Sequence, residues 1–180
     1  MGPADQLTVA RIAAAPLIVA LFSIDFPGHD YWATALLAVA MATDWFDGWI
    51  ARRSGRSSAM GSLLDPVADK ILILAALIVL VDRGVFPGWM VALIVGREFL
   101  VSGLRLAALE RGVVLSARDL GKLKTWTQSV AAIIGGLAAA GALEDEVAWW
   151  ALLAALVLTL LSGLDYARIA PSLLRRRAAV

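Results

Sequence analysis

Apolar runs of about 20 residues recur along the whole 180-residue chain, and they restrict its fold more than any other feature. Hydrophobic residues make up 61% of the sequence, charged residues make up 17%, and the mean hydropathy is +0.80. A helix of about 20 apolar residues crosses the hydrocarbon core of a bilayer. The sequence therefore predicts an all-α integral membrane protein, a bundle of six transmembrane helices at about 7–26, 31–52, 60–81, 87–110, 122–142 and 146–168.

These six spans leave no stretch for a separate soluble domain, so we expect a single membrane domain over residues 1–180. No small-x-small cleavage site precedes Asp25, and the first span is therefore expected to stay in the mature protein. Cysteine is absent, which excludes disulfides and a thiolate nucleophile. The net charge of +1 indicates no nucleic-acid partner, and we expect none.

The basic residues are unevenly distributed between the connections. Those near 25–30, 82–83 and 144–146 contain only Arg83 of the 16 Lys and Arg residues. Because cytoplasmic connections of membrane proteins are enriched in Lys and Arg, both termini are predicted to be cytoplasmic, in a prokaryotic plasma membrane. Four tryptophans fall at the opposite ends of the spans, as an interfacial belt would: Trp32, Trp89, Trp149 and Trp150.

Four aspartates lie at helical spacing beside the predicted cytoplasmic connection 52–58. Asp44 and Asp47 share one face of the second span, and Asp65 and Asp69 share one face of the third. The polar connection makes these spans an antiparallel hairpin, so the two rows are able to face each other. Carboxylates next to a bilayer are costly unless they are paired or bind metal, and carboxylate oxygens suit Mg²⁺ or Mn²⁺. The spacing favours a pair of bound divalent ions, which suits phosphoryl transfer.

Small residues continue both rows of aspartates. Gly48 and Ala51 follow on the second span and Gly61 lies on the third, which leaves room for a bulky ligand against the backbone. The arginines of the connection 52–58 would complement a diphosphate. The alternative is that the aspartates pair with these arginines and with Lys70 in a solvated network.

Residues 44–69 match, without exception, the pattern Asp-x₂-Asp-Gly-x₂-Ala-Arg-x₈-Gly-x₃-Asp-x₃-Asp. This stretch resembles the signature of the CDP-alcohol phosphatidyltransferases. The resemblance implies six transmembrane helices, usually a homodimer, and two divalent ions, Mg²⁺ or Mn²⁺, near the cytoplasmic face. It also implies transfer of a phosphatidyl group from a CDP-linked lipid to an alcohol, with release of CMP.

The resemblance assigns roles to residues of this chain. Asp44, Asp47 and Asp65 resemble metal ligands, and Asp69 resembles a metal ligand that also accepts the proton of the alcohol. Contacts to the CDP-lipid are expected from Gly48, Ala51, Arg52, Ser58, Gly61 and Thr8. Arg11 either serves this site or anchors the first helix at the interface.

The chain's one histidine, His29, falls in a connection on the outer side, where we expect a solvated loop residue. A phosphohistidine route is therefore excluded, and a carboxylate must take the proton. We expect a direct in-line attack without a covalent intermediate.

A second polar region occurs within the fourth span and at the start of the fifth. Arg97 and Glu98 fall near the middle of the fourth span and need partners inside the bundle. One interpretation is an internal Arg–Glu network that fixes helix packing. The other is a cationic pocket for a phosphorylated acceptor, formed by Arg97, Arg105, Lys122 and Lys124.

The same segments resemble the phosphatidylglycerophosphate synthase branch of the family, in which Arg-Glu-x₃-Ser-x-Leu-Arg and Gly-Lys-x-Lys-Thr recur. This implies CDP-diacylglycerol as donor and sn-glycerol 3-phosphate as acceptor. The alternatives are a synthase of phosphatidylinositol phosphate or cardiolipin and, in another class, a divalent-cation transporter. After residue 128 the sequence indicates only lipid-facing and packing residues.

Overall fold

The computed structural model describes the backbone of residues 3–54, 59–110 and 119–175, and side chains for residues 10–43, 68, 70–110, 121 and 123–164. The described chain is helical apart from short turns, which confirms the all-α prediction. Each predicted span corresponds to one helix: α1 (Pro3–Ser23), α2 (His29–Ser54), α3 (Ala59–Asp82), α4 (Gly88–Glu110), α5 (Asp119–Ala139) and α6 (Asp145–Arg175).

The first and last helices differ most from the predicted spans. Helix α1 begins at Pro3 and ends at Ser23, before a turn that contains Gly28 with a φ of 78°. Helix α6 continues to Arg175, beyond the predicted limit near residue 168. The limits differ because an apolar run indicates only the part of a helix that would lie within a bilayer. The helix itself extends beyond that part wherever the backbone hydrogen bonds continue.

Two glycines end helices in the same way. After α3, Val85 N–H donates to Leu80 O (3.1 Å) and Gly84 N–H donates to Val81 O (3.0 Å). The corresponding pair after α5 includes Gly141, and both glycines have a positive φ, 77° and 73°. This is the Schellman arrangement, which favours glycine because a Cβ is disfavoured at positive φ. It turns the chain sharply at the end of the bundle that holds these two connections.

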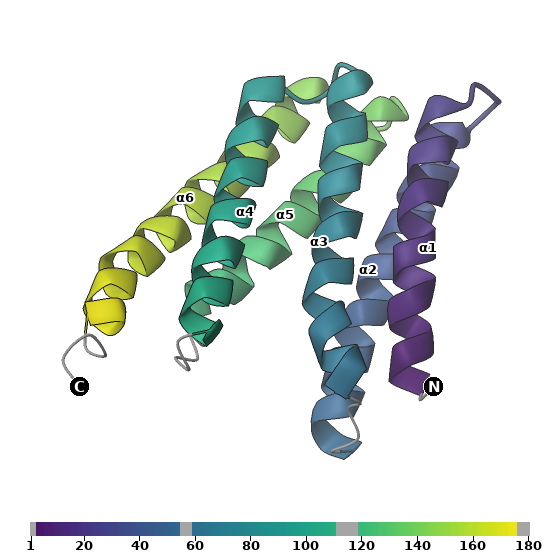
Figure 1. Ribbon diagram of the computed structural model, residues 1–180. Coiled ribbons are helices and arrows are strands. Elements are labelled where there is room, and N and C mark those ends of the chain that lie inside the picture. Colours follow the sequence, from purple (N-terminus) through teal and green to yellow (C-terminus); the bar gives the residue numbers. More distant parts are fainter. Residues whose placement is uncertain (1–2, 55–58, 111–118, 176–180) are drawn as a thin grey trace.

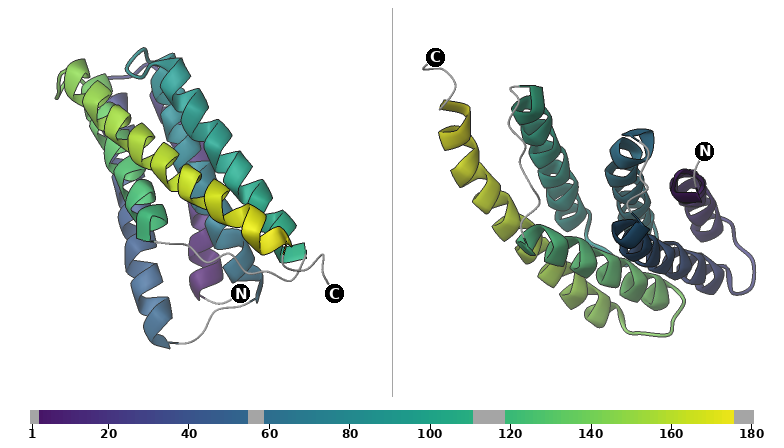
Figure 2. Two further views of the ribbon diagram at one scale, coloured as in Figure 1. Left: turned by 90° about the vertical axis from the view of Figure 1, so that its left-hand side faces the viewer. Right: turned by 90° about the horizontal axis from the view of Figure 1, so that it is seen from below.

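The helices alternate in direction along the bundle. The start of α1 and the end of α6 lie at one end, together with the end of α2 and the start of α3 (Figure 1). We call this the site end, because it carries the stretch 44–69. Helix α1 packs against α2 and α3, while α5 packs against α6 and α2 and α4 packs against α6. Figure 2 shows the resulting two groups, α1 to α3 and α4 to α6, from two further directions.

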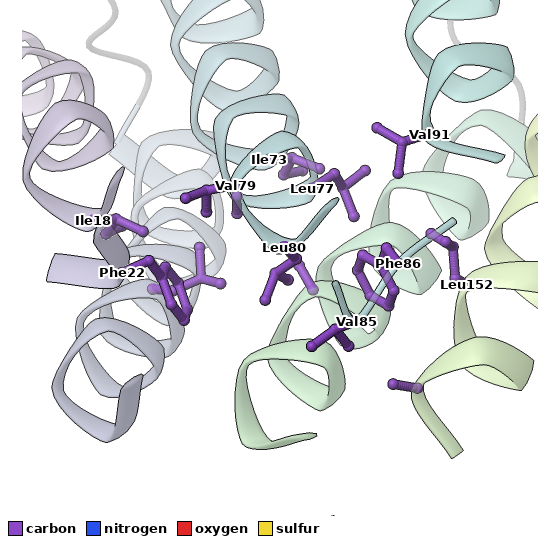
Figure 3. Packing of buried hydrophobic residues seen from close by; sticks show 14 of the residues in the cluster. Ile18, Phe22, Ile73, Leu77, Val79, Leu80, Val85, Phe86, Val91 and Leu152 are labelled. Atoms are coloured by element: carbon purple, nitrogen blue, oxygen red, sulfur yellow. The ribbon is translucent and has the colours of Figure 1, made fainter. Parts of the chain in front are cut away.

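Part of the described apolar core lies at the end of the bundle opposite the site end. Phe22 of α1, Leu80 of α3 and Phe86 of the connection before α4 are at most 3% exposed, and Figure 3 shows them among the other side chains of this cluster. Two glycines bring α5 close to its neighbours. A Cβ at Gly135 would overlap the ring of Phe86, and a Cβ at Gly136 would overlap the side chain of Thr34 on α2. Close packing of this kind requires glycine at both positions.

The outer faces of the helices carry many large apolar side chains. Val39, Phe99 and Leu100 are 61%, 69% and 61% exposed, and Trp32, Trp89 and Trp150 are also exposed. Among the described residues, Asp145–Leu164 is long and apolar enough to cross a membrane, and Ala10–Ser23 is a shorter apolar helix. Large exposed apolar surfaces mark contact with lipid or with other proteins. Six spans and cytoplasmic termini remain predictions.

A cluster of polar side chains lies at the end of the bundle opposite the site end. Arg83 Nη2 donates to Asp30 Oδ2 (2.9 Å), which joins the end of α3 to the start of α2. His29 Nδ1 lies 3.2 Å from Leu21 O and 3.3 Å from Asp30 Oδ1, and the His29 side chain is only 12% exposed. The prediction that His29 is a solvated loop residue is therefore wrong. The ring fills the space between α1 and α2, because the tight turn 24–28 brings it back against α1.

Candidate functional site

The helices place the four signature aspartates at two matched levels. Asp44 precedes the end of α2 at Ser54 by ten residues, and Asp69 follows the start of α3 at Ala59 by ten. The rise of 1.5 Å per residue puts both about 15 Å from the connection. Asp47 and Asp65 lie seven and six residues from the same helix ends, or about 10 Å. The side chains of all four lie outside the described part of the structure.

This backbone arrangement fits a carboxylate site for divalent ions. Two helices joined by residues 55–58 run in opposite directions and carry their acidic residues at equal depth. The donor set consists of carboxylate oxygens, which are the ligands that Mg²⁺ and Mn²⁺ prefer. Both helices pack against α1.

The residues expected to contact the CDP-lipid lie on the same helices or beside them. Gly48, Ala51 and Arg52 are on the last part of α2, and Gly61 is in the first turn of α3. Thr8 lies near the start of α1, which packs against both helices. Ser58 lies outside the described residues, as do the side chains of the others.

Arg11 points into the bundle from α1. It is 6% exposed, which is far less than an arginine anchored at a membrane interface would be. It lies three residues, about one helical turn, after Thr8. Of the two interpretations of Arg11, burial at the site end favours service to the site.

The second polar region forms one hydrogen-bonded cluster around Glu98. Arg97 Nη1 donates to Glu98 Oε1 (3.0 Å), and Lys124 Nζ donates to the same oxygen. Gln128 Nε2 lies 3.5 Å from that oxygen and donates to Thr159 Oγ1 of α6 (2.8 Å). Helices α4, α5 and α6 thus meet at a single carboxylate, which is 4% exposed. We call these residues, with Ser162, Lys70, Ser102 and Arg105, the Glu98 cluster.

The cluster extends from α4 to α6 and to α3. Arg97 Nη2 donates to Ser162 Oγ (2.9 Å), and Lys70 Nζ donates to Ser102 Oγ, which in turn donates to Glu98 O (2.6 Å). Lys70 directly follows Asp69 in α3. The cluster is therefore one residue along the chain from the proposed base.

Positive charge exceeds negative charge in the described part of the cluster. Lys70 interacts electrostatically with Glu98, Arg97 and Arg105, and Lys124 interacts with Glu98, Arg97 and Lys70. Lys70, Arg97 and Lys124 thus lie around the one described carboxylate, Glu98, and Arg105 lies near Lys70. Buried like charges repel unless an anion balances them. This surplus suits a dianionic phosphate.

The structure brings together some of the predicted acceptor residues. Arg97 and Lys124 meet at Glu98, whereas Arg105 is connected to them through its electrostatic interaction with Lys70. The side chain of Lys122 lies outside the described residues. The contacts between Arg97 and Glu98 also belong to the internal network that the sequence left as an alternative. The same contacts are compatible with a structural network and with a phosphate pocket. The described bonds use only part of the hydrogen-bonding capacity of Arg97 and Lys124.

The sequence missed the contribution of α6. Thr159 and Ser162 are 0% and 1% exposed, and both hydrogen-bond to the Glu98 cluster. The interpretation of the last span as only lipid-facing and packing residues is therefore wrong. Two hydroxyls three residues apart in an apolar helix are only a weak sequence signal of an interhelical contact.

The CDP-alcohol phosphatidyltransferase family model matches residues 1–161 of this chain. A CDP-diacylglycerol–glycerol-3-phosphate 3-phosphatidyltransferase of Bacillus subtilis is 40% identical over 139 residues, covering 71% of this chain and 72% of the relative. One of the same name in Rickettsia bellii is 38% identical, covering 90% and 91%. A probable phosphatidylglycerophosphate synthase of Mycobacterium tuberculosis is 39% identical, covering 91% and 78%. The family match includes the aspartate stretch and every residue of the Glu98 cluster except Ser162, and the chain belongs to the CDP-alcohol phosphatidyltransferase family.

Proposed function

We propose that this protein transfers the phosphatidyl group of CDP-diacylglycerol to sn-glycerol 3-phosphate, which yields phosphatidylglycerophosphate and CMP. Relatives that are 38–40% identical carry the name of this activity. The observation that carries the proposal is the position of the Glu98 cluster. Its Arg97 and Lys124 meet at the buried Glu98, and Ser102 and Lys70 connect Glu98 to α3, the helix that holds two of the four signature aspartates.

Asp44, Asp47, Asp65 and Asp69 would hold two divalent ions, Mg²⁺ or Mn²⁺. When bound, such ions neutralise the diphosphate and make a neighbouring hydroxyl easier to deprotonate. Four carboxylates at two matched levels on α2 and α3 support this assignment. Gly48, Ala51 and Gly61 leave space for the nucleotide against the backbone, while Arg52, Ser58 and Thr8 supply polar contacts to it.

The chemical step is a direct displacement. Asp69 accepts the proton of the acceptor's free primary hydroxyl, and that oxygen forms a bond to the lipid-side phosphorus of CDP-diacylglycerol. The bond from this phosphorus to the bridging oxygen breaks at the same time, and the oxygen leaves as part of CMP. A carboxylate next to the reacting hydroxyl is a suitable general base. No covalent enzyme intermediate is needed.

The acceptor's phosphate would be held by Arg97, Arg105, Lys122 and Lys124. Arginine recognises phosphate with two parallel hydrogen bonds, and lysine adds a compact charge. Burial strengthens both contacts because the surroundings are poor in water. An unphosphorylated alcohol offers these groups no negative charge to bind, so the same groups would select a phosphorylated acceptor.

The protein would lie in the plasma membrane with six spans, both termini in the cytoplasm and the site end facing the cytoplasm, as a homodimer. The apolar outer faces of the helices and the exposed Trp32, Trp89 and Trp150 support a lipid environment. Helix lengths of 21 to 31 residues are sufficient to cross a bilayer. The cytoplasm supplies glycerol 3-phosphate, which is charged and does not cross the membrane.

The test is to supply the purified protein with CDP-diacylglycerol, Mn²⁺ and a panel of alcohols, and to identify the lipid product. Phosphatidylglycerophosphate formed from glycerol 3-phosphate is the expected result. Product only with inositol phosphate or phosphatidylglycerol would assign the chain to another branch of the family. Metal flux across vesicles without any release of CMP would indicate a divalent-cation transporter.

A further inference from the structure

Glu98 contributes nothing directly to the proposed chemistry, yet it is the most connected side chain in the described bundle interior. Its Oε1 accepts from Arg97 Nη1 and Lys124 Nζ and lies 3.5 Å from Gln128 Nε2. A buried carboxylate is costly unless charged or polar donors surround it. This one is surrounded by two of the cations that are expected to bind the acceptor's phosphate.

Two of these three donors, Arg97 and Gln128, also hydrogen-bond to α6. Ser162 Oγ accepts from Arg97 Nη2 at 2.9 Å, and Thr159 Oγ1 accepts from Gln128 Nε2 at 2.8 Å. Gly163 leaves room for the Arg97 side chain against the backbone of α6, since a Cβ at this position would lie 3.1 Å from both Cγ and Nε of Arg97. The guanidinium is therefore held between a carboxylate, a hydroxyl and a helix backbone.

A cluster of cations needs such restraint. Arg97 and Lys124 carry like charges and repel each other at this short distance. Without Glu98 they would move apart, and their separation would have to be restored each time an acceptor binds. Preorganised donors avoid this cost.

We propose that Glu98 is a positioning residue for acceptor specificity. It holds Arg97 and Lys124 at a fixed separation as a receptor for the phosphate of the acceptor, with Ser162 and Gln128 as its supports. This inference rests on the proposed function. It differs from a purely structural role because it predicts an effect on one substrate and not on the other.

The test uses Glu98→Gln in the full-length protein, which keeps the shape of the side chain and removes its charge. The KM for glycerol 3-phosphate should rise about tenfold or more, since small displacements of binding groups have effects of this size. The KM for CDP-diacylglycerol should stay within about twofold, and kcat should change less than the acceptor KM. The ratio of kcat/KM for glycerol 3-phosphate to kcat/KM for glycerol should also be lower in Glu98→Gln than in the wild type.

Asp30→Asn is the matched control. Asp30 is a buried carboxylate that pairs with Arg83 at the opposite end of the bundle, so its loss affects stability without touching the cluster. It should lower the melting temperature and leave the acceptor KM unchanged. An equal rise of the acceptor KM in both variants would overturn the proposal.

A double-mutant cycle examines the route of the effect. If Glu98 acts through Lys124, Glu98→Gln should add little to the acceptor KM of Lys124→Gln, whereas independent effects would multiply. If Glu98→Gln does not fold, Ser162→Ala provides the test, because it removes only the hydrogen bond between Arg97 and Ser162. A severalfold higher KM for glycerol 3-phosphate in Ser162→Ala supports the proposal. An unchanged KM contradicts it.

The two proposals fail in different ways. A wild-type protein that makes no phosphatidylglycerophosphate from glycerol 3-phosphate contradicts the proposed function, whatever Glu98 does. An active wild type together with a folded Glu98→Gln variant of unchanged acceptor KM contradicts only the positioning role.

Discussion

Asp69 is the residue to which the proposed chemistry assigns the acceptor's proton. Asp69→Asn should lower kcat by at least about 10²- to 10⁴-fold, the contribution of a general base, because an amide does not accept the proton. Binding of CDP-diacylglycerol should be largely retained. Release of CMP measures the first effect, and direct binding of the nucleotide lipid measures the second. Wild-type turnover in this variant would remove Asp69 as the base.

Arg105 is the cation whose removal should separate the two substrates. Hydrogen bonds to charged groups contribute about 1.5–3 kcal/mol, so Arg105→Ala should raise the KM for glycerol 3-phosphate roughly 10- to 100-fold. The KM for CDP-diacylglycerol should change far less. Steady-state kinetics with each substrate varied in turn measures both values. Arg83→Ala, at the opposite end of the bundle, is the control, and a similar rise there would argue against a specific phosphate contact.

The sequence singles out residues whose spacing has a chemical consequence, and the roles of the four aspartates stay predictions. The aspartates stand out because four carboxylates at intervals of three and four in an apolar chain need a shared ligand. Thr159 and Ser162 do not stand out, because isolated hydroxyls are common in membrane helices and their partners lie on other helices. The burial of His29 also depends on a partner that the local sequence does not indicate, because His29 packs against Leu21 of α1.

At the scale of elements, the packing of α5 against α2 depends on Gly136. A Cβ at this position would overlap Oγ1 of Thr34 and would lie 3.0 Å from its Cγ2. Overpacking a tight contact costs about 1–3 kcal/mol, so Gly136→Ala should lower the melting temperature in detergent by roughly 2–10 °C.

Two further variants test the cause of that loss. Gly103→Ala on α4 meets no atom within 4 Å and should not destabilise the protein. Adding Thr34→Ala to Gly136→Ala should recover part of the loss, because the two sites are coupled by direct contact. A Gly136→Ala protein as stable as wild type would contradict the close approach of α5 and α2.

Helix positions could be predicted from sequence because a run of apolar residues and a helix need similar lengths to cross a bilayer. The limits of α3 and α4 fall within one residue of the predicted spans. Which helices pack together could not be predicted. Contacts such as Gly136 with Thr34 and Arg97 with Ser162 join residues far apart in the chain and depend on shape complementarity.

At the scale of the whole molecule, the predicted orientation in the membrane is based on the distribution of basic residues. The chain has no cysteine, so single cysteines report their location without interference. Glu144→Cys, between α5 and α6, should react with an impermeant thiol reagent in intact cells. Glu110→Cys, at the end of α4, should react only after the cells are opened. The reverse pattern would invert the predicted topology.

The central claim is that carboxylates from α2 and α3 together hold the divalent ions on which phosphatidyl transfer depends. The most direct measurement is the rate of CMP release from CDP-diacylglycerol and glycerol 3-phosphate as Mn²⁺ is restored to chelator-treated protein, in the wild type and in Asp65→Asn. We predict no release before Mn²⁺ is added, recovery in the wild type, and a Mn²⁺ requirement at least about tenfold higher in Asp65→Asn, as expected for loss of a ligand. CMP release that survives complete chelation, or the same Mn²⁺ requirement in both proteins, would contradict the claim.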